Sequence, residues 1–370
     1  MILKSQFKEG ALPKEPTVIE TVEQIDAEWL TAALGEAGVG ATVGSVTAER
    51  VGTGQMGSCF RLCIDYADGE GPARLIVKLP ATEPDSRAAG TLGYRCETSF
   101  YREFADRISA RIPRCFFTAA DAATNGFTLL LEDLAPAEPG DQIAGCTVDE
   151  AIAAAVNVAG LHAATWNDPS IRGLEWLIPD LTAMPEFTRE LLGNATDQFL
   201  QRYPVDANTA SVLRCFADRF AAWATGRPEP YSLLHSDYRL DNLLFAPAGA
   251  SDAVIAVDWQ VVTVGLPLRD VAFLLATGLS PDDRRRGERA IVAAYHRRLV
   301  ELGVTGYAAE RCWDDYRYAL FQGPFITVLG AFVGQRTERG DRMFTVMAER
   351  SASAIDDLDA LALLDDVKER

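Results

Sequence analysis

The chain has 370 residues, of which 48% are hydrophobic and 24% charged, and this size predicts two lobes or domains rather than one small core. Its net charge of -18 at pH 7 disfavours binding to nucleic acid or anionic lipid and is compatible with neutral or cationic small substrates. The seven cysteines form no Cys-x-x-Cys pair and there are three histidines, so neither a disulfide framework nor a zinc or histidine-rich metal site is expected.

The first elements alternate between helix and strand patterns. Residues 22–34 have helical spacing of apolar side chains, which predicts a short amphipathic helix. Residues 58–66 alternate between apolar and polar, and a turn signal at 68–71 separates them from a second apolar run at 74–79. This pattern predicts a β-hairpin.

The pattern changes from strands to helices along the chain. A helix is expected at 92–109 and a buried strand at 127–131, and the Pro-, Gly- and Ala-rich segment 135–145 is typical of a connector between lobes. Beyond residue 147 the pattern is mostly helical, with two short strands at 243–245 and 254–257. Strands first and helices afterwards favour an α+β fold with segregated lobes over a parallel α/β sheet.

A glycine pattern lies before the first of these hairpin strands, where Gly52, Gly54 and Gly57 fit the spacing Gly-x-Gly-x-x-Gly. Dinucleotide-binding folds use the same spacing but place a helix after the glycines. Here a strand pattern follows, which favours a glycine-rich loop that covers nucleotide phosphates. A plain glycine turn between strands stays open as the alternative.

Lys78 ends an apolar strand, where an ammonium group is costly unless it meets an anionic partner or reaches water. The helix that follows offers Glu97 and Glu103 as partners. Glu97 lies in the middle of the apolar stripe of that helix, whereas Glu103 points well away from it. We therefore expect Glu97 to pair with Lys78. The alternative is that Glu97 is only a residue near the helix N-terminus whose negative charge interacts favourably with the helix dipole.

The strongest chemical signal is the segment LHSDYRLDNLLF at 234–245, followed by VDW at 257–259. Asp237 and Asn242 can converge within one short loop, and a hairpin of the two short strands then returns Asp258 to the same point. Oxygen ligands of this kind suit Mg²⁺. Phosphoryl transfer needs metal ions on the phosphates and one carboxylate that positions the attacking hydroxyl and accepts its proton.

The same segment resembles the catalytic and metal-binding loops of the aminoglycoside phosphotransferase and choline- and ecdysteroid-kinase-like families, which are relatives of protein kinases. Those families carry His-x-Asp-x-x-x-x-Asn followed by an apolar residue, Asp and Trp or a similar triplet. The resemblance covers about residues 50–280. It implies a protein-kinase-like two-lobed fold, with a small β-rich, nucleotide-binding N-lobe at 1–134 and a larger, mainly helical C-lobe at 135–370 that holds the catalytic loop, metal site and acceptor site.

The resemblance also implies roles for individual residues of the C-lobe. Asp237 would be the catalytic base, His235 would brace the loop, and Arg239 stands where protein kinases keep a catalytic-loop lysine. Asn242 and Asp258 would be the Mg²⁺ ligands. Here His-Ser-Asp replaces the His-Arg-Asp of protein kinases, and Asp-Trp-Gln replaces their Asp-Phe-Gly.

In the N-lobe, the resemblance implies that Lys78 holds the α- and β-phosphates, with Glu97 as its partner. Backbone groups of Glu132, Asp133 and Leu134 would bind the adenine edge, because this stretch leads out of the last N-lobe strand. Backbone contacts leave no side-chain signature, so the hinge is placed only by its order in the chain.

Three further residues are expected to be structural. By the resemblance, Asp270 braces the catalytic loop, and His162 is interpreted as a satisfied core histidine. Asp241 is assigned a turn-forming or arginine-paired role in preference to a metal contact. Because Asp237, Asp241 and Asp258 would repel one another when close together, Mg²⁺ is expected to compensate their charge.

The acceptor is expected beside Asp237, with walls from residues 165–230 and 310–345. The aromatic residues of these ranges suit sugars, sterols or other apolar alcohols, although most also fit a helical core. They are Trp166, Trp176, Phe187, Trp223, Trp313, Tyr316 and Phe321. Asp314 and Asp315 are too few acids to indicate an aminoglycoside, so the identity of the acceptor stays open.

The predicted activity is Mg²⁺-dependent transfer of the γ-phosphate of ATP or GTP to a hydroxyl of a small metabolite or antibiotic. The sequence has no Ala-Pro-Glu motif and no insert of activation-loop length, which argues against a regulated protein kinase. The alternatives are an inactive nucleotide-binding pseudokinase or interaction module and, more weakly, a Mg²⁺-dependent hydrolase. The first ten residues contain no apolar stretch and the chain has no apolar run of about 18–20 residues, so a cytoplasmic location is expected. No nucleic-acid or membrane partner is expected, and the sequence does not predict the oligomeric state.

Overall fold

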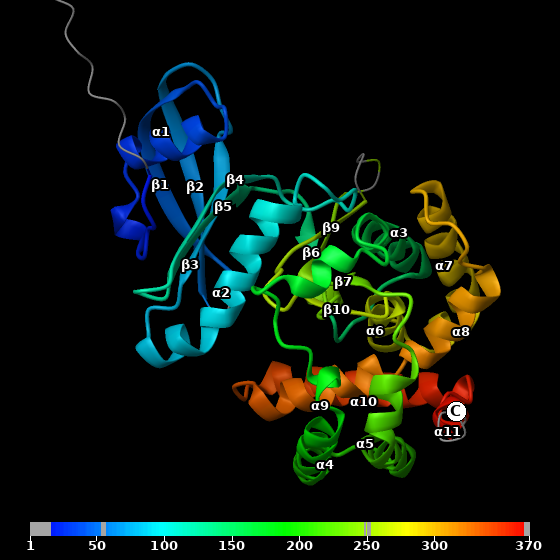
Figure 1. The fold of residues 1–370 in the computed structure, drawn as a ribbon. Helices are drawn as coiled ribbons and strands as arrows, with labels where there is room; N and C mark the ends of the chain where they lie inside the picture. Colours follow the sequence, from blue (N-terminus) through cyan, green and yellow to red (C-terminus); the bar gives the residue numbers. More distant parts are fainter. Residues whose placement is uncertain (1–15, 53–56, 248, 250–252, 366–370) are drawn as a thin grey trace, which may run out of the picture. The chain divides into compact units, whose positions relative to one another are not determined.

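The structure is a computed structural model that describes residues 16–52, 57–247, 249 and 253–365 (Figure 1). Contacts divide the chain into two compact units. The first unit comprises the chain up to Arg102 together with Arg114–Asp133, and the second comprises Glu103–Pro113 and the chain from Leu134 onward. The short segment before the fourth strand therefore belongs to the helical unit.

The first unit is built on a five-stranded antiparallel sheet with the strand order β1-β2-β3-β5-β4. Its strands are β1 Thr42–Val51, β2 Gly57–Asp68, β3 Arg74–Pro80, β4 Cys115–Asp121 and β5 Gly126–Glu132. The predicted hairpin is confirmed, since β2 pairs with β3. Strand β1 was not predicted, because it is an edge strand whose side chains are mostly exposed and lack a clear apolar alternation.

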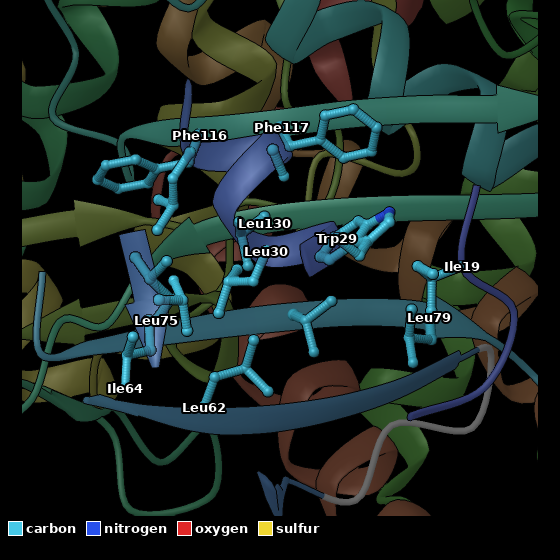
Figure 2. Packing of buried hydrophobic residues seen from close by; sticks show 14 residues of the cluster. Ile19, Trp29, Leu30, Leu62, Ile64, Leu75, Leu79, Phe116, Phe117 and Leu130 are labelled. Carbon is cyan, nitrogen blue, oxygen red and sulfur yellow. The ribbon is translucent and has the colours of Figure 1, made fainter. Parts of the chain in front are cut away.

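Helix α1 (Ala27–Glu36) covers one face of this sheet, so an amphipathic helix is present, but it begins later than the predicted residue 22 because Val22–Gln24 form a separate 3₁₀ turn. Its N-terminus is capped by Asp26, whose side chain accepts a hydrogen bond from the Trp29 N–H at 2.8 Å. Figure 2 shows Trp29 and Leu30 among the side chains of the sheet, where the Trp29 ring meets Phe117 edge to face. The buried cluster that they form is the hydrophobic core of the first unit.

Helix α2 spans Pro84–Phe104, so the predicted bounds of 92–109 are wrong at both ends. The first turns are polar and carry no apolar stripe, and proline suits the first turn of a helix. At its C-terminal end the chain leaves the helix to pack against helix α3 (Val148–Ala164). There Ser109 donates its N–H to Gly160 O at 3.3 Å, and a Cβ at Gly160 would lie 2.3 Å from Ala110 N.

The second unit is mainly helical, and its centre is α6 (Leu268–Gly278), every residue of which is buried. The other long helices are α3 Val148–Ala164, α4 Pro185–Arg202, α5 Ala207–Gly226, α7 Pro281–Glu301, α8 Ala309–Ala319, α9 Gln322–Val333 and α10 Glu338–Asp357, with a final short helix α11 Ala362–Asp365. A capping box of Thr147 and Glu150 starts α3.

Short strands of the second unit hold its loops. β7 (Ser232–Leu234) pairs with β10 (Thr263–Gly265), and β8 (Leu243–Phe245) pairs with both β6 (Glu138–Pro139) and β9 (Val254–Ala256). The two strands predicted in this region correspond to β8 and β9. β6, β7 and β10 were not anticipated, because stretches of two or three residues are too short to show a period.

Two expected absences can be compared with the structure. None of the helices in the described ranges is both long and apolar enough to cross a membrane. All seven cysteines lie in these ranges, and none of them forms a disulfide bond there.

Candidate active site

The predicted catalytic loop, residues 235–242, follows β7 and is attached to the buried start of α6. Asp270, in the first turn of α6, accepts hydrogen bonds from the backbone N–H groups of His235 at 2.7 Å and Ser236 at 2.9 Å. The same carboxylate lies 3.2 Å from Nε2 of His162, whose Nδ1 is 2.8 Å from the Tyr295 hydroxyl. The expectations that Asp270 braces the loop and that His162 is a satisfied core histidine are confirmed.

The backbone turns sharply just before Asp237. Ser236 has a φ of +68°, in the left-handed region that non-glycine residues rarely adopt. Its hydroxyl contacts the Thr263 hydroxyl of β10 at 2.7 Å, and the two backbone bonds to Asp270 fix the same turn. Such a conformation persists only where its surroundings determine it, and strained backbone of this kind is concentrated at functional sites.

Asp237 and Asn242 meet within this loop, as the sequence predicts. The side-chain amide of Asn242 donates to the backbone oxygen of Asp237 at 2.9 Å and to Oδ2 of Asp237 at 2.8 Å. Asn242 is 6% exposed and is the last residue of the short 3₁₀ turn that starts at Leu240. Because both N–H groups of its amide face Asp237, its Oδ1 is directed away from that carboxylate.

Arg239 lies between two of the loop carboxylates. Its Nε is 3.0 Å from Asp237 Oδ1, and its Nη1 donates to Asp241 Oδ2 at 2.8 Å. The charge of Asp237, above all, raises the pKa of the Arg239 guanidinium, with smaller contributions from Asp241 and Asp258, while burial opposes the shift. Arg239 thus supplies a positive charge beside two of these carboxylates, and the expectation that Mg²⁺ also compensates their charge stays a prediction.

Asp241 is held by arginines, as expected for a structural carboxylate. Arg339, from α10, contacts it through two N–H groups at 2.9 and 3.0 Å, and Gln142 donates its backbone N–H at 3.0 Å. Burial acts to raise the pKa of Asp241, but these hydrogen bonds and the charge of Arg239 outweigh it and bring the pKa below its ordinary value. Asp241 thus anchors the far side of the loop.

His235 connects the catalytic loop to the loop that carries Asp258. Its buried side chain contacts the backbone oxygen of Val257 through Nε2 at 3.0 Å, and Val257 donates its N–H to Asn242 O at 3.0 Å. Asp258 itself has a φ of +68°, so a second strained residue lies in the loop between β9 and β10. The fully buried ring of His235 thus helps to hold the loop that carries Asp258 in position next to the loop that carries Asp237.

The residues fit a Mg²⁺ ion at this point. The Oδ1 of Asn242 is left available by the orientation of its amide, and an amide with one carboxylate, Asp258, suits a metal that keeps waters and takes phosphate oxygens. Within the described residues, no group of three or more His, Cys, Asp or Glu side chains is arranged to hold a metal ion. The candidate ligand set is therefore this mixed pair.

The first unit brings Lys78 and Glu97 together. Val77 and Leu79 belong to the core cluster under α1, so Lys78 points to the opposite face of the sheet, where α2 lies. Its Nζ is 2.7 and 2.8 Å from the two carboxylate oxygens of Glu97, which is wholly buried. The expected ion pair is present, and the choice of Glu97 over Glu103 is confirmed.

The glycine pattern is described only in part. Gly52 has a φ of +73°, which favours glycine, and a Cβ at Gly57 would lie 2.9 Å from Leu79 O. Gly54 lies outside the described residues. Local backbone geometry thus explains why glycine occupies positions 52 and 57, and contact of these glycines with a nucleotide stays a prediction.

The predicted hinge follows β5. Glu132 donates its N–H to Arg114 O at 2.9 Å, and the Asp133 carboxylate is 2.8 Å from Arg61 and 3.3 Å from Arg74. The side chain of Asp133 is thus held within its own unit. Adenine binding by the backbone of Glu132, Asp133 and Leu134 stays a prediction.

The aromatic residues expected around the acceptor are mostly core. Trp176, Trp223, Tyr316 and Phe321 are buried, whereas Phe187 is 59% exposed. Trp166 packs on Tyr307, and Trp313 on Tyr316. Asp315 is fully buried between Arg227 and Arg311, so it is not a free acid for a cationic acceptor.

Sequence reasoning missed two residues that support the loop. Gln142 accepts from Leu240 N–H at 2.8 Å and donates to the Thr277 hydroxyl at 2.9 Å, which joins the loop to α6. Arg339 holds Asp241 from α10. Neither carried a signal in the sequence, since Gln142 lies in the segment expected to be a connector and Arg339 lies far along the chain.

An antiparallel sheet in one unit, a helical second unit and a loop of the form His-x-Asp-x-x-x-x-Asn together define a protein-kinase-like fold. Residues 52–304 match the ecdysteroid kinase-like family, and the chain belongs to that family.

Solved structures of small-molecule kinases have a similar fold. Choline kinase from Cryptosporidium parvum Iowa II is 13% identical with a TM-score of 0.54, and the match covers 87% of this chain and 93% of that one. The GDP complex of aminoglycoside 2'-phosphotransferase-IIIa is 15% identical with a TM-score of 0.53 and coverage of 87% and 97%. A gentamicin complex of APH(2")-IIa is 15% identical with a TM-score of 0.50 and coverage of 91% and 97%.

A shorter match involves one curated protein. Over 47 residues the chain is 43% identical to acyl-CoA dehydrogenase family member 10 from Mus musculus, which is 13% of this chain and 4% of that protein. The chain therefore matches only a small part of the length of this relative.

Proposed function

We propose that the protein transfers the γ-phosphate of ATP or GTP to a hydroxyl group of a small molecule. The observation that carries the proposal is the geometry of Asp237, whose carboxylate is oriented by Asn242 and Arg239 within a loop fixed by Asp270. The side chain of Asp237 is 27% exposed, so a substrate can reach it. Membership of a kinase-like family supports the same reaction.

Asp237 is proposed to act as the general base. Its Oδ2 is held by Asn242, which leaves Oδ1, with Arg239 beside it, to accept the proton of the acceptor hydroxyl. The deprotonating oxygen attacks the γ-phosphorus, the bond to the β-γ bridging oxygen breaks, and the nucleoside diphosphate leaves. Arg239 places its positive charge beside this carboxylate and helps to orient it.

Asn242 and Asp258 are proposed to hold Mg²⁺, which would neutralise charge on the phosphates. Lys78, kept in place by Glu97, is proposed to bind the α- and β-phosphates, as a point charge of this kind suits them. Gly52, Gly54 and Gly57 would cover the phosphates, and the backbone of Glu132–Leu134 would bind the base.

The substitution Asp237→Asn tests the assignment. The amide keeps the size of the side chain but cannot accept a proton, so we expect phosphoryl transfer to fall by about 10²–10⁴-fold. Nucleotide binding, measured as thermal stabilisation by Mg-ATP or Mg-GTP, should persist. Full turnover by this variant would refute the role of Asp237.

The same measurements separate the rival functions. A pseudokinase would bind nucleotide in both forms of the protein and consume none when hydroxylated acceptors are added. A phosphate-ester hydrolase would need no nucleotide for activity. Nucleotide consumption that depends on both an acceptor and Asp237 fits only the kinase.

A further inference from the structure

The second unit contains a cavity of about 340 Å³ next to the catalytic loop. Its wall includes Val264 and Gly265 of β10 and Tyr231, which precedes β7. β10 begins at Thr263, whose hydroxyl contacts Ser236 in the loop. This volume lies at the lower end of the range for small-molecule sites.

Positive charge dominates the cavity wall. Arg172, Arg227 and Arg269 line it, and Asp180 is the acidic residue among its lining residues. Arg227 pairs with Asp315, but that carboxylate is shared with Arg311 at 2.8 Å. Three guanidinium groups, those of Arg227, Arg269 and Arg311, therefore share the two carboxylates of Asp180 and Asp315.

Arg269 is the most constrained of these cations. Its side chain is 7% exposed and lies over the ring of Trp223, and its Nε donates to Gln322 Oε1 at 2.7 Å. Its Nη1 is 3.6 Å from Asp180, which is beyond hydrogen-bond distance. Among the described residues the hydrogen bond of this side chain is the one to Gln322, so its Nη groups remain available to an anionic ligand.

Gly265 provides the space that Arg269 occupies. A Cβ at this position would lie 2.8 Å from Nη1 of Arg269 and 3.0 Å from Leu234 Cδ1. The neighbour of Arg269 in sequence is Asp270, which fixes the catalytic loop. One short segment thus presents a guanidinium to the cavity and holds the loop that carries Asp237.

Arg172, which also lines the cavity, is held by stacking. Its guanidinium lies 3.7 Å from the centre of the Tyr231 ring. In the described part of the chain, no carboxylate lies within ion-pair distance of it. Its charge is therefore available to a ligand, and the guanidinium geometry suits a carboxylate or phosphate group.

We propose that this cavity binds the acceptor, and that the acceptor is a small hydroxylated anion bearing a carboxylate or phosphate group. The assignment of the cavity to the acceptor rests on the proposed kinase function. A polycationic acceptor is disfavoured, because its ammonium groups would face like charges. The local charge is thus opposite to the net charge of -18, which by itself suggested neutral or cationic substrates.

The charge preference is tested by binding, without nucleotide. Glucuronate, glucose and glucosamine form a matched anionic, neutral and cationic set, and glucose 6-phosphate adds a phosphate anion. By calorimetry we expect one or both anions to bind at least about 10-fold more tightly than glucose, and glucosamine to bind most weakly. The two anions distinguish a carboxylate site from a phosphate site.

Two arginine variants locate the binding. Arg172→Ala should weaken binding of the preferred anion by about 10-fold or more. Arg289→Ala is the matched control, because this exposed arginine also stacks on an aromatic ring, Trp313 at 3.5 Å, but does not line the cavity. It should leave the affinity unchanged, and melting temperatures would exclude misfolding of either variant.

Several outcomes would overturn the inference: glucose or glucosamine binding as tightly as the anions, no anion binding at millimolar concentration, or unchanged anion affinity in Arg172→Ala. Failure of the kinase proposal has a different signature. In that case the anions bind, but Mg-ATP and Mg-GTP give no transfer. If transfer occurs only to neutral or cationic acceptors, the kinase proposal stands and the anion preference fails.

Discussion

The catalytic loop and the arginine-lined cavity lie on the same pair of short strands, β7 and β10, but they balance their charges differently. In the loop, Asp270 receives two backbone N–H groups and Asp241 receives two arginines. In the cavity, arginines outnumber the carboxylates that pair with them. In a closed network each charged group is paired within the protein, and such a network fixes geometry. In an open set some charged groups lack a protein partner of opposite charge, and these groups can bind a ligand.

The largest effect is expected where the closed network is broken at Asp270. In Asp270→Asn one of the two loop N–H groups faces an N–H₂ group in place of an oxygen, and a buried unsatisfied group costs about 1–3 kcal/mol. We expect that loss in the free energy of unfolding, measured with urea, and at least about 100-fold slower transfer, since the loop loses its position.

The control for this variant is Asp314→Asn. Asp314 has a 54% exposed side chain and lies 3.9 Å from Arg317, so its removal should leave both quantities nearly unchanged. If Asp270→Asn behaved like this control, the loop would not depend on the network, and the comparison between closed and open charge sets would fail.

A second closed pair is that of Lys78 and Glu97 in the first unit. Lys78→Glu and Glu97→Lys each place two like charges at less than about 3 Å in a largely buried site, so each should weaken nucleotide binding by roughly 10–100-fold. The double swap restores opposite charges and should recover part of the affinity, as measured by calorimetry with Mg-ATP. No recovery whatever would count against the pair as the device that positions the lysine.

The open cavity should respond differently to substitution. In Gly265→Ala the added Cβ would lie 2.8 Å from Nη1 of Arg269, so the end of this side chain must shift while its Nε can stay bonded to Gln322. We expect the KM for an anionic acceptor to rise by about 10-fold, with the nucleotide KM unchanged and a stability loss below about 1 kcal/mol. Gly193→Ala is the control, since a Cβ there meets nothing within 4 Å. An equal rise in both KM values would show that the cavity and the loop are not independent.

The sequence predicted the closed network better than the open cavity, for physical reasons. Asp237, Asn242 and Asp258 are specified by local spacing, and helix geometry alone separated Glu97 from Glu103. The cavity is assembled from segments whose sequence spacing carries no signal: Arg172 precedes α4, Arg227 caps α5 and Arg269 starts α6. The role of Arg239 as a counter-charge was also missed, because its two partners are visible only once the loop is folded.

The smallest effect is expected at Arg339, on the exposed edge of the closed network. Its side chain is 54% exposed, so Arg339→Ala should cost no more than about 1 kcal/mol at neutral pH, measured by urea unfolding. Arg239 still covers Asp241 in this variant, which limits the loss. Arg336→Ala is the control. Arg336 is similarly exposed and pairs with Asp341, which lies on the same helix as Arg339.

The pH dependence of this variant tests the same contact. The pKa of Asp241 is lowered in the folded protein, so its ionised form contributes stability above the unfolded pKa of about 3.9, and that contribution is lost as the pH falls through the folded pKa. Without Arg339 the folded pKa rises, and the acid unfolding midpoint should move to higher pH. A midpoint that moves no more than in Arg336→Ala would mean that Arg239 and Gln142 hold Asp241 alone, and that the closed network ends before α10.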